Sequence, residues 1–155
     1  MAKFETATFA AGCFWGVEEI YRTTNGVKET VVGYIGGHTE TPTYEDVCSG
    51  ETGHAEAVQV TFDPKQITYT KLLEMFWSLH DPTQFNRQGP DVGSEYRSAI
   101  FYHSETQRES AQQSKKEIEK KLGKKVVTEI APATKFWKAE EYHQNFLMKH
   151  GKNLC

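Results

Sequence analysis

The chain has 155 residues, the size of one ordinary domain with a single sizeable core. Its 18 Lys and Arg residues nearly balance 21 Asp and Glu residues, giving a formal net charge of -3 with neither sign concentrated in one segment. This composition argues against a nucleic-acid-binding or membrane-surface protein. We therefore expect a monomer with one domain over residues 1–155 and a mobile tail from about residue 151.

The N-terminal sequence "MAKFETATFA" lacks the apolar core of a signal peptide, and no apolar run approaches membrane-spanning length. A reducing, cytoplasmic location is the default expectation. In that compartment three cysteines, Cys13, Cys48 and Cys155, are poorly explained by a structural disulfide framework. Catalytic, redox and packing roles remain open for them.

The first predicted strand and helix lie close to the N-terminus. "KFETATFA", residues 3–10, predicts a strand, and the apolar spacing of Phe14, Val17 and Tyr21 predicts a helix. Cys13 would then lie in the first turn of that helix.

The next predicted elements are two strands separated by a long loop. "VKETVVGYIGG", residues 27–37, is apolar on both faces, as a central strand is. A polar, glycine-rich loop follows over residues 36–54. "EAVQVTF", residues 56–62, alternates cleanly, and Glu56 shares one face with three apolar residues.

A helix is predicted over residues 69–79, because apolar residues recur there at helical spacing, and it stops before Pro82. Residues 81–97, "DPTQFNRQGPDVGSEYR", form a loop longer than compact domains usually carry. Such loops are often functional. "SAIFYH", residues 98–103, is the following strand.

The last third of the sequence adds two helices and a strand. Ser104 with Gln107 is a capping-box signal for a polar helix that runs to Gly123. "VVTEI", residues 126–130, predicts a strand, and "AEEYHQNFLMKH", residues 139–150, a last helix. Strands and helices interleave without repeats or a linker, so we expect an α/β (α+β) domain with helices packed on a mixed sheet.

Taken alone, Cys13 is better explained as a packing residue than as a nucleophile, because cysteine is among the most buried residue types. A helix N-terminus would favour its thiolate, yet no basic residue adjoins it in the sequence. Its flanking glycines, Gly12 and Gly16, permit close backbone approach.

Glu56 also has two interpretations. On an apolar face its carboxyl would stay protonated, whereas at a wet strand end it would be an ordinary acid.

Five sequence blocks, in order, resemble those of the A-type peptide methionine sulfoxide reductases: "GCFWG", "GYIGG", "YEDVCSGETGHAEAVQVTFDP", "FWSLHDPTQFNRQGPDVGSEYRSAIFYH" and "FWKAEEYHQNFL". Together they cover most of the chain, so the resemblance is highly specific. It implies a two-layer sandwich with a ferredoxin-like core. It also implies reduction of methionine sulfoxide, protein-bound and free, with preference for the S epimer at sulfur and without cofactor or metal.

The resemblance assigns the reacting groups. Cys13 is the thiol that attacks the sulfoxide sulfur, while Glu56, Tyr44 and Tyr96 match the positions that bind and protonate the sulfoxide oxygen. Protonation by a placed acid is typically worth about 100- to 10,000-fold in rate.

Three further residues match the binding pocket of the family. Phe14 and Trp15 would enclose the S-methyl group, although both rings also suit a core. Asp91 would help to anchor the substrate. It follows Pro90 here, whereas the family more often has asparagine before this aspartate.

Attack on the sulfoxide would leave Cys13 as a sulfenic acid, which a second thiol converts to a disulfide. Cys155 falls where the family often has its recycling cysteine, and thioredoxin is then the expected reductant. The tail "KHGKNLC" lacks the tyrosine more often found before that cysteine. Cys48 is the alternative.

Three rival interpretations remain. His38, Cys48 and His54 share one loop, but their spacing matches no usual zinc pattern. A cysteine hydrolase or transferase would need an imidazole base near Cys13, and His54 or His80 could supply it. In the third interpretation "CFW" is packing in a non-enzymatic binding module.

Overall fold

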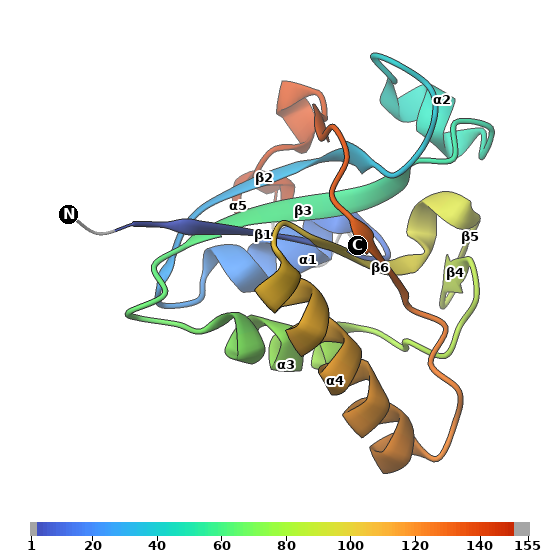
Figure 1. Cartoon of the computed structure of the whole chain (residues 1–155). Coiled ribbons are helices and arrows are strands. Elements are labelled where there is room, and N and C mark those ends of the chain that lie inside the picture. Colours follow the sequence, from blue (N-terminus) through green and yellow to red (C-terminus); the bar gives the residue numbers. More distant parts are fainter. Residues whose placement is uncertain (1–2, 151–155) are drawn as a thin grey trace.

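The computed structural model describes residues 3–150 and builds them around a six-stranded mixed sheet (Figure 1). The strand order is β7-β6-β1-β3-β2-β8, and every neighbouring pair is antiparallel except β6 and β7, which are parallel. The strands are β1 (Glu5–Ala11), β2 (Val27–Ile35), β3 (Ala55–Phe62), β6 (Ser98–Tyr102), β7 (Glu129–Pro132) and β8 (Trp137–Lys138).

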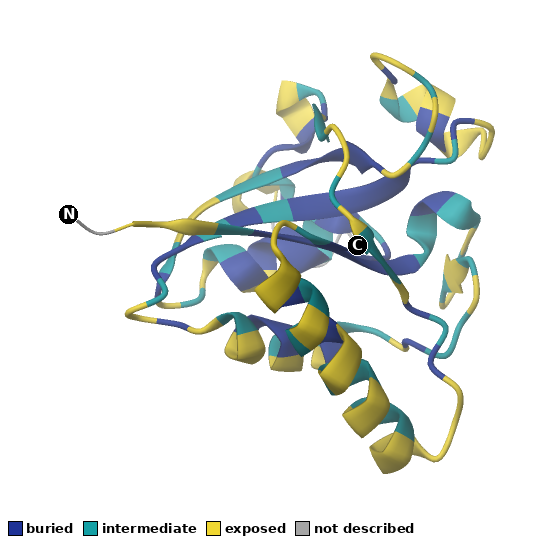
Figure 2. Cartoon of the chain, viewed as in Figure 1, coloured by how far each residue is buried: buried dark blue, intermediate teal, exposed yellow. Residues whose placement is uncertain are grey.

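Helices cover one face of this sheet and form the second layer: α1 (Phe14–Arg22), α3 (Tyr69–Leu79) and α4 (Glu105–Leu122) (Figure 1). The core lies between the layers, where the sheet and the inner helix faces are dark in Figure 2. The ring of Phe9 in β1 stacks at 5.4 Å on both Tyr21 and Phe76. The run β1-α1-β2-β3-α3-β6, with central strand order β6-β1-β3-β2, is a ferredoxin-like core, which confirms the expected fold class.

The other face of the sheet carries mainly small side chains, so the chain can cross close to it. Residues 133–136 pass over this face between β7 and β8 (Figure 1, orange). The strands present small side chains there, among them Ala10, Ala57 and Ala99. A Cβ at Gly33 would lie 2.4 Å from the carbonyl oxygen of Trp137, so only glycine admits this crossing.

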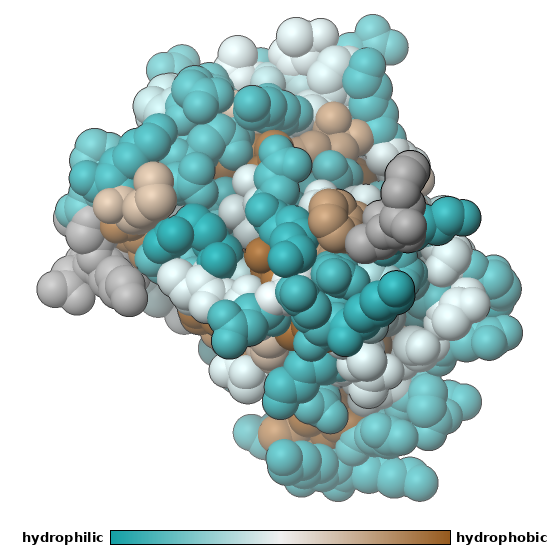
Figure 3. Space-filling model, turned by 90° about the vertical axis from the view of Figure 1, so that its left-hand side faces the viewer, coloured by the Kyte–Doolittle hydropathy of each residue, from teal (hydrophilic) through white to brown (hydrophobic). Residues whose placement is uncertain are grey.

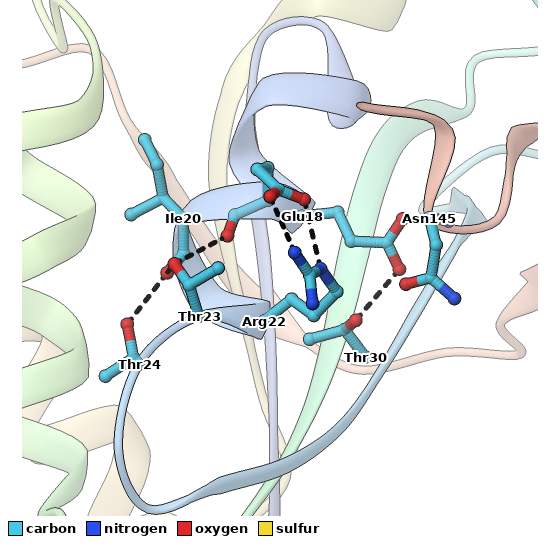
Figure 4. A network of polar contacts seen from close by, with 8 residues as sticks. Glu18, Ile20, Arg22, Thr23, Thr24, Thr30 and Asn145 are labelled. Atoms are coloured by element: carbon cyan, nitrogen blue, oxygen red, sulfur yellow. Dashed lines mark hydrogen bonds and ion pairs between the residues drawn. The ribbon is translucent and has the colours of Figure 1, made fainter. Parts of the chain in front are cut away.

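Helix α1 is fixed to the sheet by a buried acid (Figure 4). Glu18 is 1% exposed and accepts hydrogen bonds from the Thr30 hydroxyl at 2.9 Å and from the Asn145 N–H at 2.7 Å. Arg22 pairs with the neighbouring Glu19 at 2.6 Å. The start of α1, which carries the "GCFWG" motif, is therefore held in a constant place relative to β2 and the C-terminal segment.

The polar helix α4 begins and ends as predicted. The Ser104 hydroxyl accepts from the Gln107 N–H at 3.2 Å, and Gly123 ends the helix with a φ of 66°. In a full capping box the Gln107 side chain would accept from the N–H of Ser104. Here it accepts instead from the N–H of the preceding residue, His103, at 2.9 Å.

The strand predicted over residues 126–130 lies further along the chain, as β7. Residues 126 and 127 are not paired with β6, because their N–H groups bond elsewhere: Val126 to the Glu119 carboxylate and Val127 to the Pro82 carbonyl. Pairing therefore begins only at Glu129.

The single helix predicted over residues 139–150 is wrong. A 3-10 turn, η2 (Glu141–His143), is followed by the short helix α5 (Phe146–His150). Between them the Gln144 side chain bonds to both backbone groups of Val32, and Asn145 takes a φ of 54°. These contacts with β2 outweigh the local preference for a continuous helix.

Both long predicted loops contain short elements that were not predicted from the sequence. The first holds α2 (Tyr44–Cys48), and the second holds β4 (Arg87–Gln88), β5 (Asp91–Val92) and η1 (Ser94–Tyr96). The two-residue strand β8 was also missed.

The surface seen in Figure 3 is mainly hydrophilic, with apolar side chains in small separate groups. No helix within residues 3–150 is long and apolar enough to cross a membrane. The tail expected from about residue 151 lies outside the described residues.

Candidate active site

Cys13 is the N-cap residue of α1, one position before the first turn in which the sequence placed it. The preceding Gly12 has a φ of 94°, and a Cβ there would lie 2.9 Å from Cγ of Gln88. Only glycine takes this turn without strain. Cys13 is thereby brought to the helix N-terminus, where the macrodipole favours negative charge. It is half-buried and disulfide-bonded, whereas Cys155 lies outside the described residues.

Glu56 lies at the start of β3, opposite Tyr34 of β2, and its side chain faces the helical layer. It is 1% exposed, so the interpretation as a wet strand end is wrong. Its Oε1 accepts from the N–H of Phe14, the first residue of α1, at 3.3 Å. Its Oε2 is buried and has no hydrogen-bond partner among residues 3–150. The acid is therefore joined directly to the helix that Cys13 begins.

The pKa of Glu56 is raised to about 8. Burial is the largest cause, and the charges of Glu95 and Asp91 add to it, while the bond from the Phe14 N–H opposes it. Near neutral pH this carboxyl is mostly protonated, so its hydroxyl can donate to an incoming oxygen.

Tyr44 and Tyr96 are brought together, although they come from different loops. Tyr44 begins α2, Tyr96 ends η1, and both side chains lie near enough to Cys48 to interact electrostatically with its thiol. Burial raises the pKa of each phenol well above its ordinary value, and the charge of Glu56 raises it further. Both tyrosines therefore keep their protons and can serve as donors. Cys48 itself is an exposed free thiol.

The three residues expected to bind substrate differ in exposure. Phe14 is fully buried, with its ring 5.9 Å from that of Tyr34, so it is part of the core. Trp15 is half-buried and stacks on Phe146 at 3.8 Å. Asp91 is half-buried in the β4–β5 hairpin, near enough for its charge to act on Glu56. The hairpin turn at residues 89–90 accommodates the proline.

Sequence reasoning missed three polar residues near this cluster: Glu95 and His143, which are buried, and Glu140, which is half-buried. Glu95 is 3% exposed, and its Oε1 has no partner among residues 3–150. The Gly93 φ of 146° lets this carboxylate lie over the backbone, where a Cβ would be 2.1 Å from Oε1. Only its place beside Tyr96 could have drawn attention to it.

The histidines proposed as bases have structural partners. In His54, Nδ1 accepts from the Gly37 N–H at 3.0 Å and Nε2 bonds the Thr39 carbonyl at 2.7 Å. In His80, both ring nitrogens are also bonded, and burial lowers its pKa to about 4. Neither ring is left to activate Cys13. The rival metal site has no suitable ligand cluster within the described part of the chain.

Comparison with known proteins agrees with this geometry. A family model described as peptide methionine sulfoxide reductase matches residues 5–155. A Methanothermobacter thermautotrophicus protein named peptide methionine sulfoxide reductase MsrA is 56% identical, with 100% of this chain and 93% of that protein covered. Saccharomyces cerevisiae Mxr1 in reduced form superimposes with a TM-score of 0.93 at 40% identity, covering 99% of this chain and 89% of that chain.

A second Mxr1 structure, in complex with Trx2, superimposes with a TM-score of 0.64 at 28% identity, over 93% of this chain and 85% of that one. The sequence matches extend over essentially the whole chain, and they include the motifs that carry Cys13 and Glu56. The chain therefore belongs to the peptide methionine sulfoxide reductase family, and it is an enzyme that reduces methionine sulfoxide to methionine.

Proposed function

We propose that this chain reduces the S epimer of methionine sulfoxide, in oxidised proteins and peptides and as the free amino acid, with Cys13 as nucleophile and Glu56 as acid. The observation that carries the proposal is the Glu56 carboxyl. It is buried, its pKa is raised to about 8, and one of its oxygens has no partner among residues 3–150. Such a group can donate its proton to an acceptor on a bound substrate.

The proposed reaction begins when the Cys13 thiolate attacks the sulfoxide sulfur. Glu56 donates a proton to the sulfoxide oxygen, which Tyr44 and Tyr96 hold by hydrogen bonds. The bond between the two sulfurs then breaks as the oxygen passes to the Cys13 sulfur, so that methionine leaves reduced and Cys13 becomes a sulfenic acid. The electron pair that reduces the substrate thus comes from the cysteine sulfur.

Phe14, Trp15 and Asp91 form the proposed substrate pocket. The indole of Trp15 is the accessible part of the wall, since it is half-buried while Phe14 is fully buried. The S-methyl group packs on the Trp15 indole, with Phe14 behind it in the core, because sulfur-bearing groups interact favourably with aromatic side chains. Asp91 anchors the polar part of the substrate from the β4–β5 hairpin.

Recycling uses a second thiol and thioredoxin. The Cys155 thiol condenses with the sulfenic acid, which releases water and forms a disulfide, and the thioredoxin dithiol then reduces that disulfide. The solved complex of the similar protein Mxr1 with Trx2 supports this reductant. We propose further that the enzyme works as a cytoplasmic monomer, as its composition suggests.

Turnover of each epimer tests the proposal. With dithiothreitol as donor, we expect methionine to form from the S epimer and little from the R epimer, in the free amino acid and in a peptide. Reduction must stop after one turnover without a thiol donor. A hydrolase would need no reductant, so thiol-independent product from an ester or amide substrate would favour that rival.

A Cys155→Ser variant should lose multiple turnover with thioredoxin while keeping it with dithiothreitol, because the small thiol can reduce the sulfenic acid directly. Methionine release is measured with each donor. Cys48→Ser is the matched control. If Cys155→Ser keeps full thioredoxin-driven turnover and Cys48→Ser loses it, the recycling thiol is Cys48.

A Glu95→Gln variant should shift the alkaline fall of the rate to lower pH. The Glu95 charge helps to raise the pKa of Glu56, so its removal lets Glu56 lose its proton earlier as the pH rises. The rate is followed between pH 6 and pH 10. Glu51→Gln, which changes an exposed carboxylate, is the matched control. An unchanged profile would mean that the Glu95 charge does not reach Glu56.

A further inference from the structure

The segment between β8 and α5 lies next to the candidate site and is hydrogen-bonded to the sheet. The Gln144 amide donates to the Val32 carbonyl and accepts from the Val32 N–H, each at 2.9 Å. The same amide group donates to the Ala139 carbonyl at 3.0 Å. Glu140 and His143 therefore project from a backbone whose place is set by β2.

Glu140 joins two residues of the site with one carboxylate. Its Oε1 accepts from the Tyr34 hydroxyl at 2.9 Å, and its Oε2 accepts from the Tyr44 N–H at 2.9 Å. Tyr34 lies directly opposite Glu56 in the sheet. Burial alone would raise the pKa of Glu140, but these bonds lower it, so the group stays ionised and holds both donors.

His143 holds the indole of Trp15. Its Nδ1 accepts from the Trp15 Nε1–H at 3.0 Å, and Phe146 stacks on the same indole at 3.8 Å. The imidazole is 1% exposed, and its centroid is 4.5 Å from that of Tyr44. Burial lowers the pKa of His143, which keeps the ring neutral and its Nδ1 able to accept.

We propose that Glu140 and His143 are positioning residues of the reductase: Glu140 places Tyr44 for the sulfoxide oxygen, and His143 orients Trp15 for the S-methyl group. The inference rests on the proposed roles of Tyr44 and Trp15. It assigns a separate kinetic effect to each residue, because an oxygen donor acts on the chemical step whereas a methyl-binding wall acts on substrate affinity and choice.

The test uses two disruptive variants of the full chain, with methionine sulfoxide and its S-ethyl homologue as probes and dithiothreitol as donor. Glu140→Leu removes both accepting oxygens and should lower kcat about 10- to 100-fold with little change in KM, since small displacements of a reacting group have effects of this size. His143→Phe removes the acceptor for Trp15. It should raise KM for the methyl substrate by up to about tenfold. It should also reduce the preference for the methyl substrate over its ethyl homologue.

Conservative variants distinguish positioning from support of the fold. Glu140→Gln can still accept from Tyr44, and the His143→Asn amide oxygen lies near the place of Nδ1, so both should recover most of the lost parameter. Glu141→Gln, an exposed neighbour in an ion pair with Lys138, is the matched control. Circular dichroism with thermal unfolding gives the folded fraction of each variant. Should Glu140→Leu fail to fold, Tyr34→Phe removes one of the two bonds and must lower kcat by a smaller factor.

The proposal is overturned if each disruptive variant merely loses folded protein, with unchanged kcat per folded molecule, KM and methyl preference. It is also overturned if the conservative variants are as impaired as the disruptive ones. Failure of the proposed roles of Tyr44 and Trp15 has a different signature, because Tyr44→Phe would then keep the kcat, and Trp15→Phe the KM, of the unmodified protein.

Discussion

A Cys13→Ser variant is expected to release no methionine from methionine sulfoxide, with either dithiothreitol or thioredoxin as donor. A serine hydroxyl is a poor nucleophile at neutral pH, and its oxygen cannot be oxidised to a sulfenic acid or form a disulfide. The loss is therefore complete rather than partial. Product release by chromatography over many enzyme equivalents is the measurement.

The fold should tolerate this change well. Cys13 is the N-cap of α1, and serine is among the residues preferred at that position, so the helix can begin as before. With dithiothreitol present, so that the unmodified protein also has Cys13 as a thiol, thermal unfolding should show a Tm no lower than that of the unmodified protein. Cys48→Ser is the matched control and should retain dithiothreitol-driven turnover. Product above the blank from Cys13→Ser would mean that another cysteine is the nucleophile.

A Glu56→Gln variant is expected to lose about 100- to 10,000-fold in kcat/KM, the usual size of general acid assistance. The amide can still accept from the Phe14 N–H, so α1 and β3 remain joined, but it has no acidic proton to give. In the unmodified enzyme the rate should fall as the pH rises through about 8, where Glu56 loses its proton. The pH dependence of kcat/KM for both proteins is the measurement.

The stability of Glu56→Gln should increase at high pH, whereas its activity falls. The pKa of Glu56 rises from 4.5 to about 8 on folding, so the folded state binds this proton more tightly than the unfolded state. The favourable contribution is complete below pH 4.5 and is lost as the pH rises through about 8. Each pKa unit corresponds to about 1.4 kcal/mol. Above pH 8 the poorer catalyst should therefore have the higher Tm.

The pH at which this difference appears is itself informative. A thiolate on reduced Cys13 would disfavour a second negative charge nearby and raise the pKa of Glu56 further. If Glu56→Gln is less stable than the unmodified protein at every pH, the carboxyl is not held in its protonated form. Its proposed role as an acid would then fail, although the role of Cys13 would not.

The central part of the fold follows from periodic patterns in the sequence. The alternation around Val58 and Val60 predicted β3, and the same alternation placed Glu56 on the buried face, where the structure has it. Capping residues also predicted α4, because Ser104 and Gly123 act through local bonds and backbone conformation. In α2, Thr43 and Asp46 form a full capping box that the same reasoning could have found.

The remaining features depend on contacts between distant residues. The break after His143 arises because Gln144 bonds to Val32, which lies 112 positions away in the chain. A local sequence pattern cannot show a hydrogen bond between residues so far apart. In the same way Glu140 and Glu95 look like ordinary surface acids in the sequence, and only the tertiary structure turns the first toward Tyr44 and buries the second.

The last third of the chain supplies both outer strands of the sheet, β7 beside β6 and β8 beside β2. During synthesis the ribosome releases the N-terminal part first, so the ferredoxin-like core is complete before either outer strand has emerged. Until then β6 and β2 carry unpaired N–H and C=O groups along their open edges, which are templates for pairing with other chains. A chain that terminates before residue 129 would keep both edges open, and we expect such truncated products to aggregate.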